Sequence, residues 1–279
     1  MTNRTVPHAF LKWCGGKGRM IGHIIPRMPE KINTYYEPFL GGGAIFFELA
    51  RQKRFDRAVI GECNDELINI YKMIQEDVEG LILELKTGDY EYNKPNYLRI
   101  RAINTNTLSD VGRAARFMYL NKTAFNGLHR VNKKGQFNVP FGKYTNPVIC
   151  DEINLRAVSD ILMNVQVCKS DFEQIINDAK EGDVVYFDPP YMPVSKTSKF
   201  TSYTVDGFTE ADQRRLAACF DKLVSKNICT VLSNSYTPLI MELYGKYKPT
   251  ELMGARVVGG PASYRKPSAE IVCSAGLKL

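Results

Sequence analysis

The sequence Val184-Val185-Tyr186-Phe187-Asp188-Pro189-Pro190-Tyr191 is the strongest single indication of fold in this chain. Its first four residues are apolar β-formers and predict a buried strand. The two prolines lack N–H donors and have a fixed φ, so the chain must leave the sheet in a rigid loop. Open α/β sheets bind ligands at the carboxyl ends of their strands. An acid before the prolines and an aromatic residue after them favour a ligand site over a structural turn.

On both sides of this motif the sequence alternates between strand and helix patterns, which predicts an α/β fold with a largely parallel sheet. The helix at 44–51 carries Phe46, Phe47 and Leu49, which we interpret as core. The predicted strands are 33–37, 57–62, 165–168, 184–188 and 229–233, with terminal strands near 247–253 and 270–274. The predicted helices are 44–51, 65–85, one starting at 172, 209–226, and one starting at 237.

The alternation stops between residues 86 and 150. This segment contains a Tyr-rich stretch, a predicted helix over 113–120, and a predicted β-hairpin over 131–137. We therefore expect three parts: residues 1–72 and 151–279 form the α/β domain, and residues 73–150 are an inserted module of helices and a hairpin.

The net charge of +7 comes from residues 111–150, the second half of the inserted module. The chain has 37 basic and 30 acidic residues, and residues 111–150 contain seven of the basic residues and no Asp or Glu. A solvated basic face is one explanation. Aromatic residues interleaved with these cations favour the other explanation, a nucleic-acid partner.

Other features limit the remaining classes. We find no apolar run long enough for a membrane span and no signal-peptide pattern, so we expect a cytoplasmic protein. The seven cysteines are dispersed, which favours reduced thiols. The three histidines lack metal-ligand spacing, so we expect no metal.

The Asp188 loop suits transfer of a group to an exocyclic amino nitrogen. Such a nitrogen is a poor nucleophile while its lone pair is delocalised into the ring. The Asp188 carboxylate and the Pro189 carbonyl could each accept one N–H bond and favour a tetrahedral nitrogen, while Tyr191 stacks on the base. A base in duplex DNA would have to be flipped out to reach such a loop.

A second candidate site is the turn Glu37-Pro38-Phe39-Leu40-Gly41-Gly42-Gly43, followed by Glu62 at the end of the next predicted strand. Glycines here let a ligand approach the backbone, and the later acid is placed to bind ribose hydroxyls. The pattern is neither G-x-G-x-x-G nor a phosphate-binding G-K-[ST] loop. A cofactor with a ribose and no phosphate, such as S-adenosylmethionine, fits best.

Together these motifs resemble the Dam type of DNA N6-adenine methyltransferase, a bacterial or phage family. The resemblance covers nearly the whole chain. Its specific blocks begin at Phe10 (FLKWCGGK), Tyr35 (YYEPFLGGGAIFFE), Tyr119 (YLNKTAFNGLHR), Gly135 (GQFNVPFGKY) and Val184 (VVYFDPPY). It implies a Rossmann-like methyltransferase sheet with an inserted target-recognition module.

The resemblance implies that S-adenosylmethionine is the cofactor and that catalysis uses Asp188, Pro189, Pro190 and Tyr191. The implied cofactor-binding residues are Trp13, Lys17, Glu37, Phe39, Gly41, Gly43, Glu62, Asp171 and Asp188. Trp13, the only Trp in the chain, would otherwise be read as core. Glu62 departs from the family, which more often has Asp there.

The family's usual target is adenine in GATC within double-stranded DNA. The implied DNA-binding residues are Lys12, Phe125, Asn126, Leu128, Arg130, Lys133, Lys134, Pro140 and Tyr144. Arg130 suits a guanine edge, Leu128 and Pro140 suit a thymine methyl, and the hairpin lysines suit phosphates. Phe125 and Asn126 match the pair that wedges into the duplex, although the family often has Tyr at the first position. Thr123 and His129 also depart from common family residues.

Two other functions stay open at this stage: an enzyme that methylates RNA or cytosine N4, and a DNA-binding protein without activity. The Ser/Thr/Lys-rich stretch from Ser195 to Thr204 is either a surface loop or a lid over the flipped base. The family resemblance implies a monomer without an obligate protein partner. A stand-alone role and a role beside a restriction nuclease both remain open.

Overall fold

The computed structural model describes residues 6–191, 208–255 and 267–277. The predicted loop or lid from Ser195 to Thr204 lies outside these residues. The chain forms two compact units. The first unit consists of Met1–Gly18, Gly41–Gln52 and Glu62–Lys169, and the second unit consists of Arg19–Leu40, Lys53–Gly61 and Ser170–Leu279.

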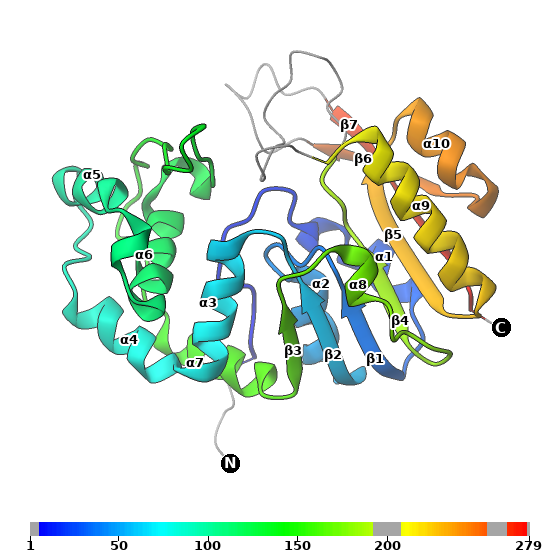
Figure 1. Ribbon diagram of the computed structural model, residues 1–279, viewed down its shortest axis with the longest axis horizontal. Coiled ribbons are helices and arrows are strands. Elements are labelled where there is room, and N and C mark those ends of the chain that lie inside the picture. Colours follow the sequence, from blue (N-terminus) through cyan, green and yellow to red (C-terminus); the bar gives the residue numbers. More distant parts are fainter. Residues whose placement is uncertain (1–5, 192–207, 256–266, 278–279) are drawn as a thin grey trace. The chain divides into compact units, whose positions relative to one another are not determined.

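The strands form a mixed sheet with the order β3-β2-β1-β4-β5-β7-β6, which confirms the predicted α/β class (Figure 1). Strands β1, β2, β4 and β5 are parallel, and β7 runs antiparallel to both β5 and β6. The strands are β1 (Ile32–Glu37), β2 (Phe55–Gly61), β3 (Val165–Cys168), β4 (Val184–Phe187), β5 (Cys229–Ser235), β6 (Thr250–Ala255) and β7 (Pro267–Ala275).

The strand order reverses between β1 and β4, and this reversal lies within the second unit. From β1 the chain proceeds to β2 on one side, and from β4 it proceeds to β5 on the other. Such a reversal opens a crevice at the carboxyl ends of the two central strands. Glu37 ends β1 and Asp188 directly follows β4, so both carboxylates belong to this edge of the sheet.

In the second unit the central strands are buried on both faces. All four residues of β4 and all seven of β5 are buried. Helix α9 packs against β5 (Figure 1), and it begins at a capping box made by Thr209 and Asp212. The helical elements of this unit are α1 (Ile21–Ile24), η2 (Ile25–Arg27), α8 (Phe172–Ile175), α9 (Glu210–Ser225), α10 (Pro238–Tyr244) and η5 (Gly245–Tyr247). A further 3-10 helix, η1, spans Lys17–Met20.

The first unit contains the inserted module, and two predicted helix boundaries in it were wrong. The helix predicted over 65–85 is interrupted at Asp77, whose carboxylate caps a second helix by accepting from the Gly80 N–H. The helix predicted over 113–120 is longer at both ends, since Ser109 caps it earlier. The helical elements are α2 (Ala44–Arg51), α3 (Asp65–Glu76), α4 (Val78–Thr87), α5 (Lys94–Ala102), η3 (Thr105–Thr107), α6 (Asp110–Thr123), η4 (Phe125–Gly127) and α7 (Glu152–Leu162).

The interpretation of α2 as a core helix is confirmed, because Phe46, Phe47 and Leu49 are all buried. The predicted hairpin is confirmed as well. It is closed by an antiparallel bridge between Val131 and Phe137 and by a hydrogen bond from the Asn132 N–H to the Gln136 carbonyl.

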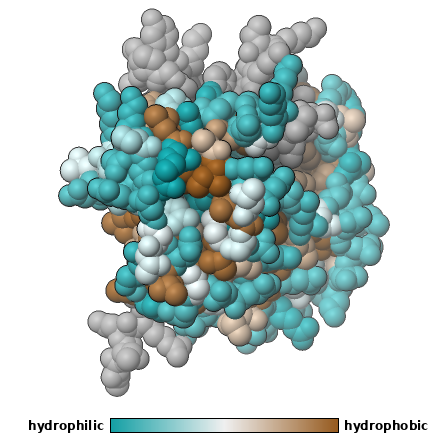
Figure 2. All heavy atoms as spheres, turned by 60° about the vertical axis from the view of Figure 1, so that its left-hand side comes forward, coloured by the Kyte–Doolittle hydropathy of each residue, from teal (hydrophilic) through white to brown (hydrophobic). Residues whose placement is uncertain are grey.

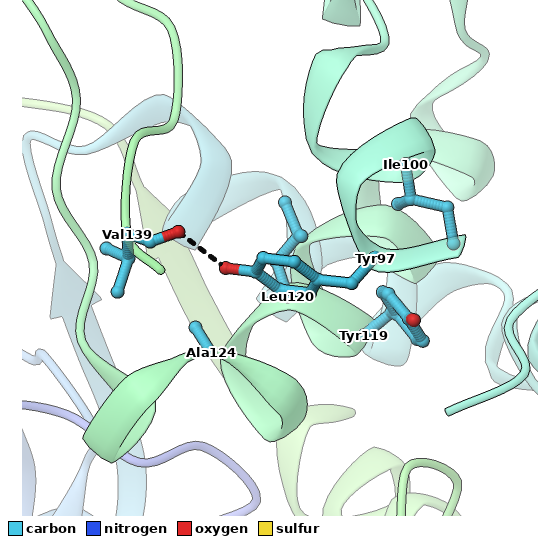
Figure 3. Close-up of a cluster of buried hydrophobic side chains, with 6 residues drawn as sticks. All are labelled: Tyr97, Ile100, Tyr119, Leu120, Ala124 and Val139. Carbon is cyan, nitrogen blue, oxygen red and sulfur yellow. Dashed lines mark hydrogen bonds between the residues drawn. The ribbon is translucent and has the colours of Figure 1, made fainter. Parts of the chain in front are cut away.

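The inserted module has its own small core (Figure 3). Side chains from α5, α6 and the segment after the hairpin meet there: Tyr97, Ile100, Tyr119, Leu120, Ala124 and Val139. The Tyr97 hydroxyl donates to the Val139 carbonyl at 2.8 Å. This bond ties the returning hairpin strand to α5, so the core sets the position of the hairpin relative to the helices.

Candidate active site and DNA-binding module

Asp188 is held by a chain of two hydroxyl groups of the sheet, of which one contacts its carboxylate. The Ser233 hydroxyl on β5 donates to Asp188 Oδ1 at 2.9 Å, and the Tyr186 hydroxyl lies 2.7 Å from the same serine oxygen. Because serine has one hydroxyl proton, Tyr186 must donate to Ser233. Burial, reinforced by the Asp188 charge, raises the pKa of Tyr186, so the phenol keeps its proton. This chain of hydrogen bonds orients one oxygen of the carboxylate, a group whose two oxygens can accept several hydrogen bonds.

The rest of the loop is anchored on the same strands and on α9. The Gln213 amide donates to the Pro190 carbonyl at 3.2 Å, and Asn234 donates to Gln213 at 3.0 Å. Both amide side chains are fully buried. The Tyr191 hydroxyl donates to Glu270 on β7. The loop therefore has a separate support for its backbone and for its aromatic ring.

Glu37 and Phe39 lie at the carboxyl end of β1 in the second unit. Glu37 is 2% exposed and accepts a 2.8 Å hydrogen bond from the Tyr35 hydroxyl. Burial, followed by the charge of Glu37, raises the pKa of Tyr35, so this phenol also stays a donor. The Phe39 ring packs near the rings of Phe172, Phe187 and Phe208. A buried carboxylate suits a positively charged ligand, and a cluster of aromatic rings suits an apolar one.

Asp171 is exposed and caps α8 by accepting from the Glu173 N–H. It also forms an ion pair with Arg215 at 2.5 Å. These contacts give Asp171 a structural role in this structure, and its predicted cofactor contact stays a prediction.

In the first unit, Glu62 organises the glycine turn. Its Oε2 accepts from the Gly41 N–H at 3.2 Å, and its Oε1 accepts from the N–H groups of Cys63 and Asn64. Burial raises the pKa of Glu62, and these three N–H groups oppose that shift. Gly41 has φ +51°, and a Cβ at this position would lie 2.7 Å from Trp13 Cδ1. Glycine is required there for both reasons.

Trp13 connects the glycine turn with the inserted module inside the first unit. Beyond its contact with Gly41, its ring stacks on His129 with centroids 5.7 Å apart and lies near Phe117. Lys17 is 5% exposed, and its ammonium donates to the Gly15 carbonyl at 2.9 Å. Trp13 is half-buried and covers the glycine turn, and its predicted contact with the cofactor stays a prediction.

We expect His129 to make the stability of the protein depend on pH. Burial, followed by the positive charge of Arg116, lowers its pKa from 6.5 to about 4. The unfolded chain therefore takes up this proton at higher pH than the folded chain does, and stability falls as pH drops from 6.5 towards 4. The full effect is about 3 kcal/mol in the free energy of unfolding. We expect His129→Phe, which keeps a stacked ring without titrating, to flatten this dependence in urea unfolding measured across that range. Equal pH slopes in the two proteins would contradict the assignment.

Lys12 and Tyr144, both predicted to contact DNA, lie together. The Lys12 ammonium is 3.9 Å from the centre of the Tyr144 ring. Asn121 holds the Lys12 backbone, since its amide accepts from the Lys12 N–H at 2.9 Å and donates to the Lys12 carbonyl at 2.7 Å. A buried asparagine on α6 thus joins the N-terminal segment to the module.

The predicted wedge residues occupy an exposed turn. Phe125 is 50% exposed, an unusual state for a large aromatic side chain. Asn126 has φ +55°, a left-handed conformation that asparagine tolerates. Leu128 is half-buried against the module core. An exposed ring on a fixed turn suits insertion between bases.

Arg130 and the hairpin lysines point to the surface. Arg130 donates to the Asn138 side-chain and backbone oxygens at 2.6 and 3.1 Å, which fixes its guanidinium. Lys133 and Lys134 lie in the exposed hairpin turn, and Pro140 is exposed on the returning strand. Figure 2 shows one face of the protein, on which hydrophilic residues predominate.

Sequence reasoning missed the supporting residues Asn121, Gln213, Ser233, Asn234 and Glu270. A polar run in the buried strand β5, Ser233-Asn234-Ser235, was the available signal for two of them, because a buried strand seldom carries three polar residues.

Within the described residues, no group of three His, Cys, Asp or Glu side chains could hold a metal ion. The helices of the described ranges include none with the length and apolar character of a membrane span.

The strand order and the Asp188 loop define a Rossmann-like α/β methyltransferase fold. The family described as D12 class N6 adenine-specific DNA methyltransferase matches residues 13–256. The protein belongs to this family. It is a site-specific DNA methyltransferase that modifies adenine.

The chain is also similar to several known methyltransferases over nearly their full length. The type II methyltransferase M1.LlaDCHI of Lactococcus lactis subsp. cremoris is 46% identical over 269 residues, covering 94% of this chain and 93% of the relative. The type II methyltransferase M.MjaIII of Methanocaldococcus jannaschii is 41% identical, covering 92% and 94%. A DNA adenine methylase of Haemophilus influenzae is 32% identical, covering 96% and 94%.

Proposed function

We propose that this enzyme transfers the methyl group of S-adenosylmethionine to N6 of a flipped-out adenine within GATC in double-stranded DNA. The observation that carries the proposal is the Asp188 loop at the strand-order reversal, where Ser233 orients the carboxylate. This geometry supplies an acceptor for an amino group at the edge of the sheet where α/β proteins bind their ligands.

In this proposal the Asp188 carboxylate and the Pro189 carbonyl each accept a hydrogen bond from one N–H of the adenine amino group. Pro190 keeps the loop rigid. The carboxylate would also stabilise the positive charge that grows on nitrogen as the methyl group arrives. The methyl–nitrogen bond would form as the methyl–sulfur bond of the donor breaks, and the nitrogen would then release one proton to solvent. Tyr191 stacks on the base and holds it in place. The rest of the rate enhancement comes from alignment of the amino nitrogen with the methyl donor.

The cofactor would supply a sulfonium-activated methyl group. We propose that Trp13, Lys17, Gly41, Gly43 and Glu62 of the first unit contribute to binding it. In the second unit we propose Glu37, Phe39, Asp171 and Asp188. Glu37 is a buried carboxylate, which suits a cationic ligand, and Phe39 offers an aromatic surface. By this division, residues 1–72 and 151–279 bind the cofactor and catalyse, and residues 73–150 read the target.

For the DNA, we propose that Phe125 enters the duplex and Asn126 meets the base left unpaired by flipping. Arg130 would read a guanine, with Leu128 and Pro140 near a thymine methyl group. Lys12, Lys133, Lys134 and Tyr144 would complete the contacts to the first guanine and the backbone. The exposure of Phe125 and the fixed guanidinium of Arg130 support these roles.

The deciding experiment uses tritiated S-adenosylmethionine and two duplexes that differ only in one GATC site. After the reaction, the DNA is digested and the labelled nucleoside is identified. We expect label in N6-methyladenine of the GATC duplex alone. Label in both duplexes would overturn the GATC assignment, and label in another base or only in RNA would overturn the proposed substrate.

The two kinds of basic residue in the hairpin should differ in their effects. We expect Arg130→Ala to cost about 1–3 kcal/mol of discrimination against a substituted guanine, because a bidentate contact to that base is lost. Lys134→Ala, the matched control, should weaken binding to all duplexes alike and reduce the salt dependence. Competition binding with GATC and single-base variants measures both, and loss of discrimination in the lysine variant would reverse the assignment.

A further inference from the structure

We propose that Glu270, on β7, is a positioning residue for methyl transfer: it fixes the Tyr191 ring in the plane where the ring stacks on the target base. This inference rests on the proposed stacking role of Tyr191. It adds a residue that lies 79 positions along the chain from the ring it orients.

The contact is well placed to fix the ring. The Tyr191 hydroxyl donates to Glu270 Oε2, and β7 is paired on both sides at this point, with Ser235 of β5 and Leu252 of β6 opposite Glu270. A strand paired on both sides moves little, so its carboxylate is a stable anchor. Burial, together with the charges of Asp188 and Glu270, raises the pKa of Tyr191, so its hydroxyl remains protonated and can donate.

The backbone of the loop is held independently. Gln213 and Asn234, which are fully buried, support the Pro190 carbonyl without involving Glu270. Loss of the Glu270 acceptor should therefore release the ring and leave Asp188 in place. Stacking itself needs no hydroxyl, so the hydroxyl would serve to limit the orientations of the ring.

A structural role for Glu270 makes a different prediction. A carboxylate that only stabilises the sheet would affect folding, and its effect would be independent of the Tyr191 hydroxyl. A positioning role requires that the two effects overlap, which a double-mutant cycle measures.

The test compares the wild type with Glu270→Met, Tyr191→Phe and the double variant in single-turnover methylation of a GATC duplex. We expect each single variant to slow the methyl-transfer step by about tenfold, and the double variant to be no slower than Tyr191→Phe alone. Glu270→Gln, which keeps an acceptor oxygen, should retain most of the rate. Glu251→Met, an exposed position on β6, is the matched control and should leave the rate unchanged.

A second readout follows the ring directly. With 2-aminopurine in place of the target adenine, a loosened stack should raise the fluorescence of the flipped base in Glu270→Met at unchanged DNA affinity. The proposal would be overturned if the rate losses of the two single variants multiplied in the double variant. It would also be overturned if Glu270→Met lowered stability without slowing the methyl-transfer step. If Glu270→Met does not fold, Tyr191→Phe removes the same hydrogen bond without altering β7, and an unchanged rate in that variant would also overturn it.

Failure of the proposed function has a separate signature. A wild type that leaves the GATC duplex unlabelled would refute the target sequence alone. The cycle would then be run on an adenine-containing duplex that the wild type does methylate.

Discussion

Replacing Asp188 with alanine should lower the rate constant of methyl transfer by about 100-fold to 1000-fold, the usual loss when a fixed group that stabilises transition-state charge is removed. In the proposed mechanism the Asp188 carboxylate accepts a hydrogen bond from the amino group and stabilises the positive charge that develops on nitrogen. Single-turnover kinetics with the cofactor and a GATC duplex, both saturating, isolates this step from binding.

The Asp188→Ala variant should fold normally, because its carboxylate is only partly buried and its hydroxyl partner Ser233 retains Tyr186 as a neighbour. Asp178→Asn, an exposed residue of the second unit, is the control and should react at the rate of the wild type. A fully active Asp188→Ala variant would refute the catalytic assignment. An inactive variant that has also lost its fold would be set aside in favour of Asp188→Asn.

Replacing Tyr97 with alanine should reduce the free energy of unfolding by about 3–5 kcal/mol, the range for removing a large buried aromatic side chain. Tyr97 is fully buried in the core of the inserted module, and its hydroxyl holds the Val139 carbonyl (Figure 3). Because Val139 lies on the segment that returns from the hairpin, the loss should also weaken DNA binding. Urea unfolding and DNA affinity, measured on the same preparation, test both statements.

Two further variants separate the causes. Tyr97→Phe keeps the ring and removes the hydroxyl, so it should cost about 1–3 kcal/mol for the carbonyl that loses its donor. Leu98→Ala, on the same helix and 40% exposed, should change stability by no more than about 0.5 kcal/mol. A Tyr97→Ala variant as stable as Leu98→Ala would show that this cluster does not support the module.

Local sequence patterns predicted the α/β class, the hairpin, the core helix α2 and the family correctly. These features depend on local patterns: an apolar run before two prolines, glycines after a strand, and turn residues between β-formers. Side-chain periodicity and backbone restrictions act over a few residues, so they can be read without knowledge of the fold. Helix boundaries were less accurate, since a single cap such as Asp77 or Ser109 decides where a helix starts.

The residues that support the proposed site could be identified only from the folded chain. Ser233 reaches Asp188 because β4 and β5 are neighbours, and Glu270 reaches Tyr191 because β7 returns antiparallel beside β5. Asn121 meets Lys12 across 109 residues of sequence. Such partners share no local pattern, because a hydrogen bond depends on the distance between two atoms in space. Strand pairing and core packing set that distance, so these residues can be identified as partners only from the folded structure.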